Sequence, residues 1–162
     1  MRTLTLIRHA KSSWDDPKIE DFHRPLNERG FRDAPVMAQR LGNLLEATPQ
    51  LVASPALRTT TTARIFAEVL GIAESAIRFE PPIYDASAAE LLAVVRKLDD
   101  AFPNVALFGH NPGLTDLSHQ LARCTFSEMP TCAMAVLEFD VDRWADVAQG
   151  RLFAYSFPKE RQ

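Results

Sequence analysis

Three features of this 162-residue sequence predict an α/β fold. Short apolar runs alternate with longer segments in which apolar residues recur at helical spacing. Residues 105–108 form a continuous apolar run, which is typical of a strand buried on both faces of a sheet. Three strand-to-helix junctions carry arginine or histidine, at the edge where the carboxyl ends of parallel strands meet.

The first predicted strand, residues 3–7, is followed by a polar loop that reaches residue 26. This loop is longer than most connections in α/β domains, which favours a functional or mobile segment. Asn27 is the expected N-cap of the next helix. Because Gly30 and Pro35 interrupt the helical pattern, the helix is either kinked near Pro35 or restarts there with Asp33 as its cap.

The other elements follow from the same signals. A strand at residues 51–53 leads into a helix at 56–70, with Gly71 as its left-handed C-cap. Further strands are expected at 77–80, 105–108, 134–139 and 152–157, and further helices at 87–98 and through residue 121. The last two strands are expected to be antiparallel at one side of the sheet.

Length and composition favour one domain, residues 1–162, and argue against several functions. A net charge of -3 leaves no electrostatic footprint for nucleic acid or an anionic membrane. Cys124 and Cys132 have neither zinc-site nor redox-pair spacing. The N-terminal apolar run is too short for a signal peptide, and no later run approaches a membrane span, so we expect a cytoplasmic protein.

The candidate catalytic residues lie at three junctions. Arg8 and His9 end the first strand, Arg58 lies in the first turn of the helix at 56–70, and His110 follows the strand at 105–108. These edges converge in an open α/β sheet. Arginine offers permanently charged donors to phosphoryl oxygens, and a neutral imidazole can attack phosphorus. An Arg-His pair alone is more often structural, but the combination indicates phosphoryl chemistry.

Several motifs resemble those of the histidine phosphatase superfamily. The Arg-His-Ala sequence at residues 8–10 resembles the family's Arg-His-Gly signature, with Ala10 where most members have glycine. Residues 54–63 are similar to its Ser-Pro-x-x-Arg-x-x-x-Thr-Ala segment, and residues 109–112 to its second histidine motif. Residues 21–30 resemble the stretch before the first helix of the small SixA-type phosphohistidine phosphatases. The resemblance implies a three-layer α/β/α sandwich with a mostly parallel central sheet, the phosphoglycerate mutase-like fold.

The resemblance also implies roles for individual residues. His9 would be the nucleophile that becomes a transient phosphohistidine, and neither a metal nor a cofactor is expected. Arg8, Arg58 and His110 would surround the phosphoryl oxygens. Arg24 and Asn111 are the candidates for additional substrate contacts.

The leaving-group acid stays open. Many family members place a glutamate after the third strand, but this sequence has Tyr84-Asp85 there. Asp85 and Asp21 are candidates, or no acid is needed. Because imidazole leaves more readily than an alkoxide, a missing acid favours phosphohistidine on another protein, such as a signalling phosphotransfer domain, as the substrate. The effect of the Ala10 methyl group also stays open.

Two other interpretations remain. The chain could be a small-molecule phosphomonoesterase or mutase of the same superfamily, or a catalytically weak module that binds phosphoproteins through the same pocket. The chain has little room for the insertions that close over small substrates in mutases and acid phosphatases, which favours a protein substrate. We expect a monomer.

Overall fold

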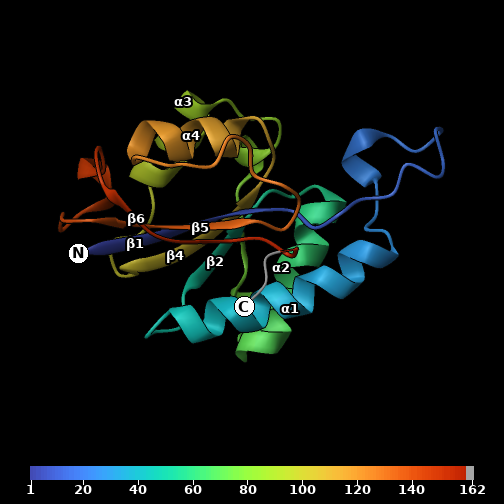
Figure 1. Ribbon diagram of the computed structural model, residues 1–162, viewed down its shortest axis with the longest axis horizontal. Coiled ribbons are helices and arrows are strands. Elements are labelled where there is room, and N and C mark those ends of the chain that lie inside the picture. The colour runs from blue at the N-terminus through green and yellow to red at the C-terminus, as the bar shows by residue number, and fades with distance from the viewer. Residues whose placement is uncertain (160–162) are drawn as a thin grey trace.

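The computed structural model describes residues 1–159 and has a six-stranded central sheet in the order β3-β2-β4-β1-β5-β6 (Figure 1). β4 pairs in parallel with β1 and β2, and β2 pairs in parallel with β3. β5 and β6 are antiparallel at one side, as predicted. The strands are β1 (Arg2–Arg8), β2 (Gln50–Ala53), β3 (Arg78–Phe79), β4 (Asn104–Gly109), β5 (Met134–Phe139) and β6 (Arg151–Ser156).

Helices cover both faces of the sheet, which confirms the predicted α/β/α layers (Figure 1). α1 (Glu28–Leu44) and α2 (Leu57–Leu70) lie on one face. α3 (Ala88–Arg96) and α4 (Gly113–Leu121) lie on the other. Short 3₁₀ turns complete the chain: η1 (Asp21–His23), η2 (Glu74–Ala76), η3 (Pro81–Ile83) and η4 (Trp144–Asp146).

The protein has one apolar core on each face of the sheet, and the alternation of side chains along β4 contributes to both. Val105 and Leu107 are fully buried in the cluster that includes α3 and α4. Ala106 and Phe108 are fully buried in the cluster that includes α1 and α2. Successive side chains of a strand point to opposite faces, so a central strand between two helical layers must be apolar at every position.

α1 runs through both residues that interrupt its sequence pattern. The side chain of Asn27 caps the helix by accepting the N–H of Gly30 at 2.9 Å, as predicted. Pro35 lies inside the same helix, so the predicted alternative of a restart with Asp33 as cap is wrong. Glycine is required at position 30 because a Cβ atom there would lie 2.3 Å from the carbonyl oxygen of Lys11.

Two pairings hold the ends of the long loop after β1 together. The N–H of Asn27 donates to the carbonyl of Lys11 at 3.0 Å, and the N–H of Ser13 donates to the carbonyl of Pro25 at 2.8 Å. The intervening segment, residues 14–21, is exposed. The loop at the carboxyl end of β1 therefore has fixed ends and an exposed middle.

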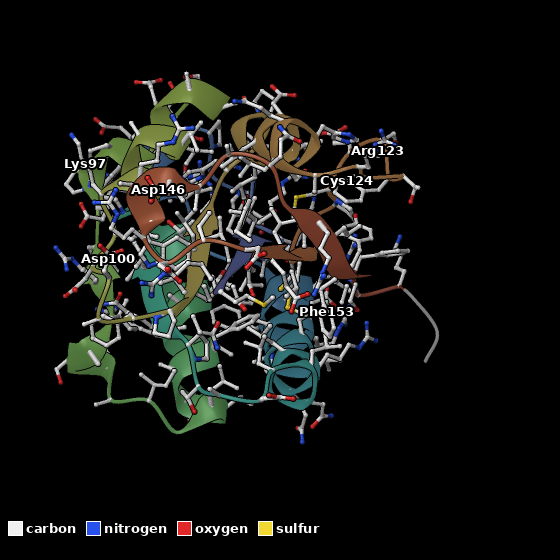
Figure 2. The ribbon with its side chains drawn as sticks, turned by 90° about the vertical axis from the view of Figure 1, so that its left-hand side faces the viewer. Lys97, Asp100, Arg123, Cys124, Asp146 and Phe153 are labelled. Atoms are coloured by element: carbon white, nitrogen blue, oxygen red, sulfur yellow. The ribbon has the colours of Figure 1, made fainter. Side chains whose placement is uncertain are left out.

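Asp100, labelled in Figure 2, lies near Arg2, where β1 begins. The carboxylate of Asp100 accepts the backbone N–H of Trp144 at 2.8 Å and lies 3.8 Å from the guanidinium of Arg2. The buried indole of Trp144 donates to the carbonyl of Phe102 at 2.8 Å. Within residues 1–159, no helix combines the length and apolar character needed to cross a membrane.

Candidate active site

A pocket of about 390 Å³ lies at the carboxyl ends of β1, β2 and β4, where the three sequence motifs meet. β1 delivers Arg8 and His9, the first turn of α2 delivers Arg58, and the end of β4 delivers His110. The structure brings all the predicted site residues to its lining: Arg8, His9, Arg24, Arg58, His110 and Asn111. Their catalytic roles remain predictions.

The hydrogen bonds of His9 define its tautomer. Its Nδ1 atom lies 2.7 Å from the carbonyl oxygen of Ala10. Because a carbonyl can only accept, Nδ1 carries the proton and Nε2 keeps its lone pair. The Nε–H of Arg58 donates to this lone pair at 3.3 Å. Nε2 therefore carries the lone pair that the predicted nucleophilic role requires, and it faces the guanidinium group expected to bind a phosphoryl oxygen.

Burial keeps both pocket histidines neutral. Burial is the main cause that lowers the pKa of His9 to about 3, and the positive charges of Arg58 and Arg8 lower it further against the hydrogen bond to Ala10. Burial and the charge of Arg58 likewise lower the pKa of His110 to about 4. His9 therefore has the unprotonated form that attack on phosphorus requires at pH 7.

A network of backbone contacts holds the turn after β1. The N–H of His9 donates to the carbonyl of Gly109 on β4 at 3.1 Å. The N–H of Ala10 donates to the hydroxyl of Thr62 at 3.1 Å, and that hydroxyl donates to the carbonyl of Arg58 at 2.7 Å. These bonds explain why the turn and the first turns of α2 form one unit.

Ala10 belongs to the core rather than to the pocket wall. Its side chain is fully buried in the cluster that packs between the sheet and the α1 and α2 layer. Its N–H is already bound to Thr62. The methyl group that replaces the usual glycine therefore does not narrow the pocket.

Arg8 and Asn111 share one anchor. Nη1 of Arg8 and Nδ2 of Asn111 donate to the carbonyl of Met129, at 2.9 and 2.8 Å. The amide oxygen of Asn111 accepts the N–H and the hydroxyl of Thr115. These bonds orient the Asn111 side chain in the pocket lining, and its predicted substrate contact stays a prediction.

His110 is held by the Ser-Pro motif. Its Nε2 atom lies 2.8 Å from the hydroxyl oxygen of Ser54, and its Nδ1 atom is buried without a hydrogen-bond partner among residues 1–159. When the Ser54 hydroxyl donates to Nε2, Nδ1 carries the proton. His9 and His110 lie close, with ring centroids 5.4 Å apart.

Two aromatic residues that were not predicted for the site also line the pocket, Trp14 and Tyr84. Trp14 is 71% exposed, and its ring centroid lies 3.4 Å from the guanidinium carbon of Arg24, which is only 7% exposed. Tyr84 contacts the ring of His110 edge-on, with the centroids 5.5 Å apart. The only available sequence signal was a large aromatic residue within a polar segment.

Asp21 and Asp85, the two candidates for the leaving-group acid, lie in different surroundings. Burial opposes ionisation of Asp21, but hydrogen bonds from Tyr84 and Arg58 and the charges of Arg58 and Arg24 outweigh it and lower the pKa to about 2. Asp21 is therefore an ionised acceptor at pH 7 in this state. Asp85 lines the pocket with its backbone in the left-handed region at a φ of 54°, which aspartate tolerates better than most residues.

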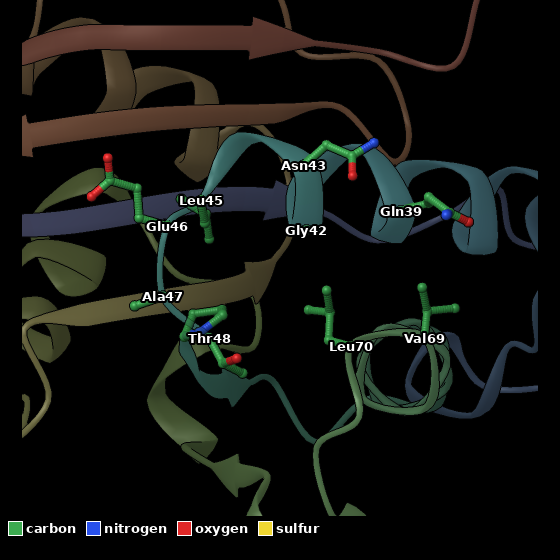
Figure 3. A pocket seen from close by; sticks show the side chains of 10 residues that line it. Gln39, Gly42, Asn43, Leu45, Glu46, Ala47, Thr48, Val69 and Leu70 are labelled. Atoms are coloured by element: carbon green, nitrogen blue, oxygen red, sulfur yellow. The ribbon is translucent and has the colours of Figure 1, made fainter.

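Among residues 1–159, no group of three His, Cys, Asp or Glu side chains is placed to hold a metal ion. A second cavity of about 360 Å³ lies between the C-terminal ends of α1 and α2 (Figure 3). Among the described residues that line it, Glu46 is the only charged one. The concentration of cations and imidazoles therefore identifies the pocket around His9 as the candidate active site.

Comparison with known proteins agrees with this geometry. The sequence model of one protein family, the histidine phosphatase superfamily (branch 1), matches residues 4–82 of this chain. An uncharacterised chloroplastic protein of Arabidopsis thaliana is 31% identical over 165 residues, which span 97% of this chain and 73% of that protein.

Two solved structures are similar over nearly their whole length. A protein assigned as phosphohistidine phosphatase SixA from Agrobacterium tumefaciens is 28% identical, with a TM-score of 0.80 over 97% of this chain and 98% of its own. A protein given the same assignment from Nakamurella multipartitia is 27% identical, with a TM-score of 0.79 over 98% and 97% of the two chains. The shared fold, the motif match and a pocket built from those motifs lead to one conclusion: this chain is a phosphatase of the histidine phosphatase superfamily and is of the SixA type.

Proposed function

We propose that this chain hydrolyses phosphohistidine on another protein through a covalent phosphoryl intermediate on Nε2 of His9. The observation that carries the proposal is the state of His9, whose Nδ1 proton is committed to Ala10 while the Nε2 lone pair faces Arg58. A neutral, oriented imidazole next to a phosphate-binding arginine is a nucleophile prepared for phosphorus.

The chemical steps balance without a dedicated acid. His9 Nε2 forms a bond to phosphorus as the bond between phosphorus and the substrate's ring nitrogen breaks, and the bonding pair stays on that nitrogen. The substrate ring leaves as neutral imidazole, because its other nitrogen already carries a proton. Water then attacks the phosphoryl group on His9, releasing inorganic phosphate and restoring the Nε2 lone pair.

The positive charge of the pocket supports the transition state. Arg8, Arg24 and Arg58 line it, and the neutral His110 can donate one hydrogen bond. These preorganised donors would stabilise the charge on the equatorial phosphoryl oxygens. The ionised state of Asp21 favours a leaving group that needs no acid, and this is why phosphohistidine fits better than an alkyl ester.

The protein nature of the substrate is supported by the mouth of the pocket and by the relatives. Trp14 is largely exposed beside the catalytic groups, where it can contact a large partner. The similar Agrobacterium and Nakamurella proteins are assigned as phosphohistidine phosphatases. The cytoplasmic location and the monomeric state expected from the sequence are part of the same proposal.

Trapping by an alkaline denaturing quench, with a ³²P-phosphohistidine protein as substrate, tests the proposal. The native chain should acquire an alkali-stable, acid-labile label, whereas His9→Ala should acquire none and lose turnover while staying folded. His119→Ala is the matched control, because His119 is exposed and does not line the pocket.

Other outcomes would replace the proposal. Phosphate release without a labelled enzyme would indicate direct attack by water. Much faster turnover of ordinary phosphate esters would indicate a small-molecule phosphatase. Tight binding of the phosphoprotein without release or label would indicate a binding module.

A further inference from the structure

Asp21 accepts hydrogen bonds from Arg58 through both its backbone carbonyl and its carboxylate. Nη1 of Arg58 donates to the backbone carbonyl of Asp21 at 2.7 Å, and Nη2 donates to its carboxylate Oδ2 at 3.0 Å. The remaining nitrogen, Nε, donates to His9 Nε2. Every nitrogen of the Arg58 guanidinium therefore has an acceptor, although this is the group expected to bind a phosphoryl oxygen.

The Asp21 carboxylate also binds two other residues of the pocket. Oδ1 accepts the Nε–H of Arg24 at 3.2 Å, and Oδ2 accepts the hydroxyl of Tyr84 at 2.7 Å. One small anion thus collects donors from α2, from the loop after β1 and from the residue after η3. The equatorial oxygens of a phosphoryl group would use such a converging set of donors.

Charge balance gives a reason for this arrangement. Arg8, Arg24 and Arg58 line a single pocket, and burial together with the positive charge of Arg58 lowers the pKa of Arg8. Without an anion the three guanidinium groups repel one another. Asp21 is ion-paired with Arg24 and Arg58, and so supplies a compensating charge.

Asp21 is also placed where it can move away. Its side chain is 50% exposed, whereas that of Arg58 is 6% exposed. The η1 turn that carries Asp21 contains no buried residue. Displacing its carboxylate therefore uncovers no core, whereas Arg58 is fixed by α2.

We propose that Asp21 is a positioning residue that occupies the phosphoryl-binding donors between turnovers and is displaced from Arg58 by the phosphoryl group of the substrate. It keeps Arg58 and Arg24 oriented, and it competes with the phosphate product and thereby favours release. The inference rests on the proposed function only in that this pocket binds a phosphoryl group.

Isothermal titration with inorganic phosphate, and with tungstate as a tetrahedral oxyanion, tests this role. Asp21→Asn should bind phosphate about tenfold more tightly than the native chain, because the charged competitor for Arg58 is lost. Asp15→Asn is the matched control, since Asp15 lies in the same exposed loop and its loss changes the net charge equally. It should bind phosphate as the native chain does.

A second measurement separates positioning from a purely structural role. The melting temperature of Asp21→Asn should fall below the native value without ligand, because the arginine charges are uncompensated, and tungstate should restore it. Tyr84→Phe removes one donor to Asp21 and should tighten phosphate binding severalfold in the same direction.

Each outcome has a defined meaning. Unchanged or weaker phosphate binding by Asp21→Asn overturns the inference and leaves the proposed function standing. Equal tightening by Asp15→Asn also overturns it, since net charge alone would then be the cause. If Asp21→Asn does not fold, unchanged phosphate affinity of Tyr84→Phe overturns it. Failure of the native chain to bind either oxyanion overturns both proposals.

Discussion

A single hydroxyl group holds the turn that carries the nucleophile. Thr62 lies on α2, yet its Oγ1 accepts the N–H of Ala10 and donates to the carbonyl of Arg58. Helical threonines commonly donate to a carbonyl in the preceding turn, and Thr59, Thr60 and Thr61 also do so. Thr62 also bridges two motifs 52 residues apart.

Thr62→Val should therefore affect both stability and catalysis. The buried N–H of Ala10 would lose its partner, at a cost of about 1–3 kcal/mol in the free energy of unfolding, and the turn at His9 would shift. Urea denaturation and the rate of phosphohistidine hydrolysis measure the two effects. Thr62→Ser keeps the hydroxyl and should retain most of the stability and most of the hydrolysis rate. Equal losses in the valine and serine variants would contradict this account.

At the level of elements, the start of α1 packs closely against the turn after β1, which carries His9. The carbonyl of Lys11 accepts the N–H of Asn27, the cap of α1. The same carbonyl oxygen lies 2.3 Å from the position that a Cβ atom of residue 30 would occupy. The glycine that weakens the helical pattern thus permits the close packing that anchors the loop after β1.

Gly30→Ala should destabilise the protein by about 1–3 kcal/mol, because the overlap is with backbone and outweighs the gain of about 1 kcal/mol in helix propensity. Gly42→Ala is the control on the same helix. Its Cβ would meet only the tip of Leu70, at 3.1 Å, a side chain that Figure 3 shows bordering the cavity. Chemical denaturation should show little loss for Gly42→Ala, and a comparable loss in both variants would refute the explanation.

At the level of the whole molecule, the pocket makes stability depend on pH. His9 and His110 have folded-state pKa values of about 3 and 4, against an ordinary value of 6.5. Below pH 6.5 the unfolded chain takes up protons that the folded chain does not bind. The stability that these histidines contribute is therefore fully present above pH 6.5 and lost as the pH falls toward 4.

Urea denaturation at pH 7 and pH 5 measures this dependence. Each histidine should contribute a loss of about 2 kcal/mol at pH 5, from the difference in proton binding. Asp21, with its lowered pKa, loses its contribution only below the ordinary aspartate range and so lies outside this window. A double variant, His9→Gln with His110→Gln, should show a smaller loss, and an unchanged pH dependence would contradict the assigned burial effect.

Much of the fold and the centre of the site follow from the sequence. The apolar run at 105–108 predicted a strand with both faces covered, and β4 is such a strand. Asn27 and Gly71 marked the start of α1 and the end of α2 correctly. Arg8, His9, Arg58 and His110 could be predicted to converge because parallel strands all end at one edge of the sheet.

Only the tertiary structure decided how this centre is completed. Asp21 lies in the long segment after β1, which has no periodicity to predict its course, and it meets Arg58 and Tyr84 across 37 and 63 residues of chain. The amide of Asn111 is engaged by Met129 and Thr115, and the Ala10 methyl points into the core. Local pattern determines which segments are strands and helices, because propensity and burial act over a few residues. The orientation of each side chain depends on the donors and acceptors that distant segments bring within 3 Å, so the sequence alone does not reveal it.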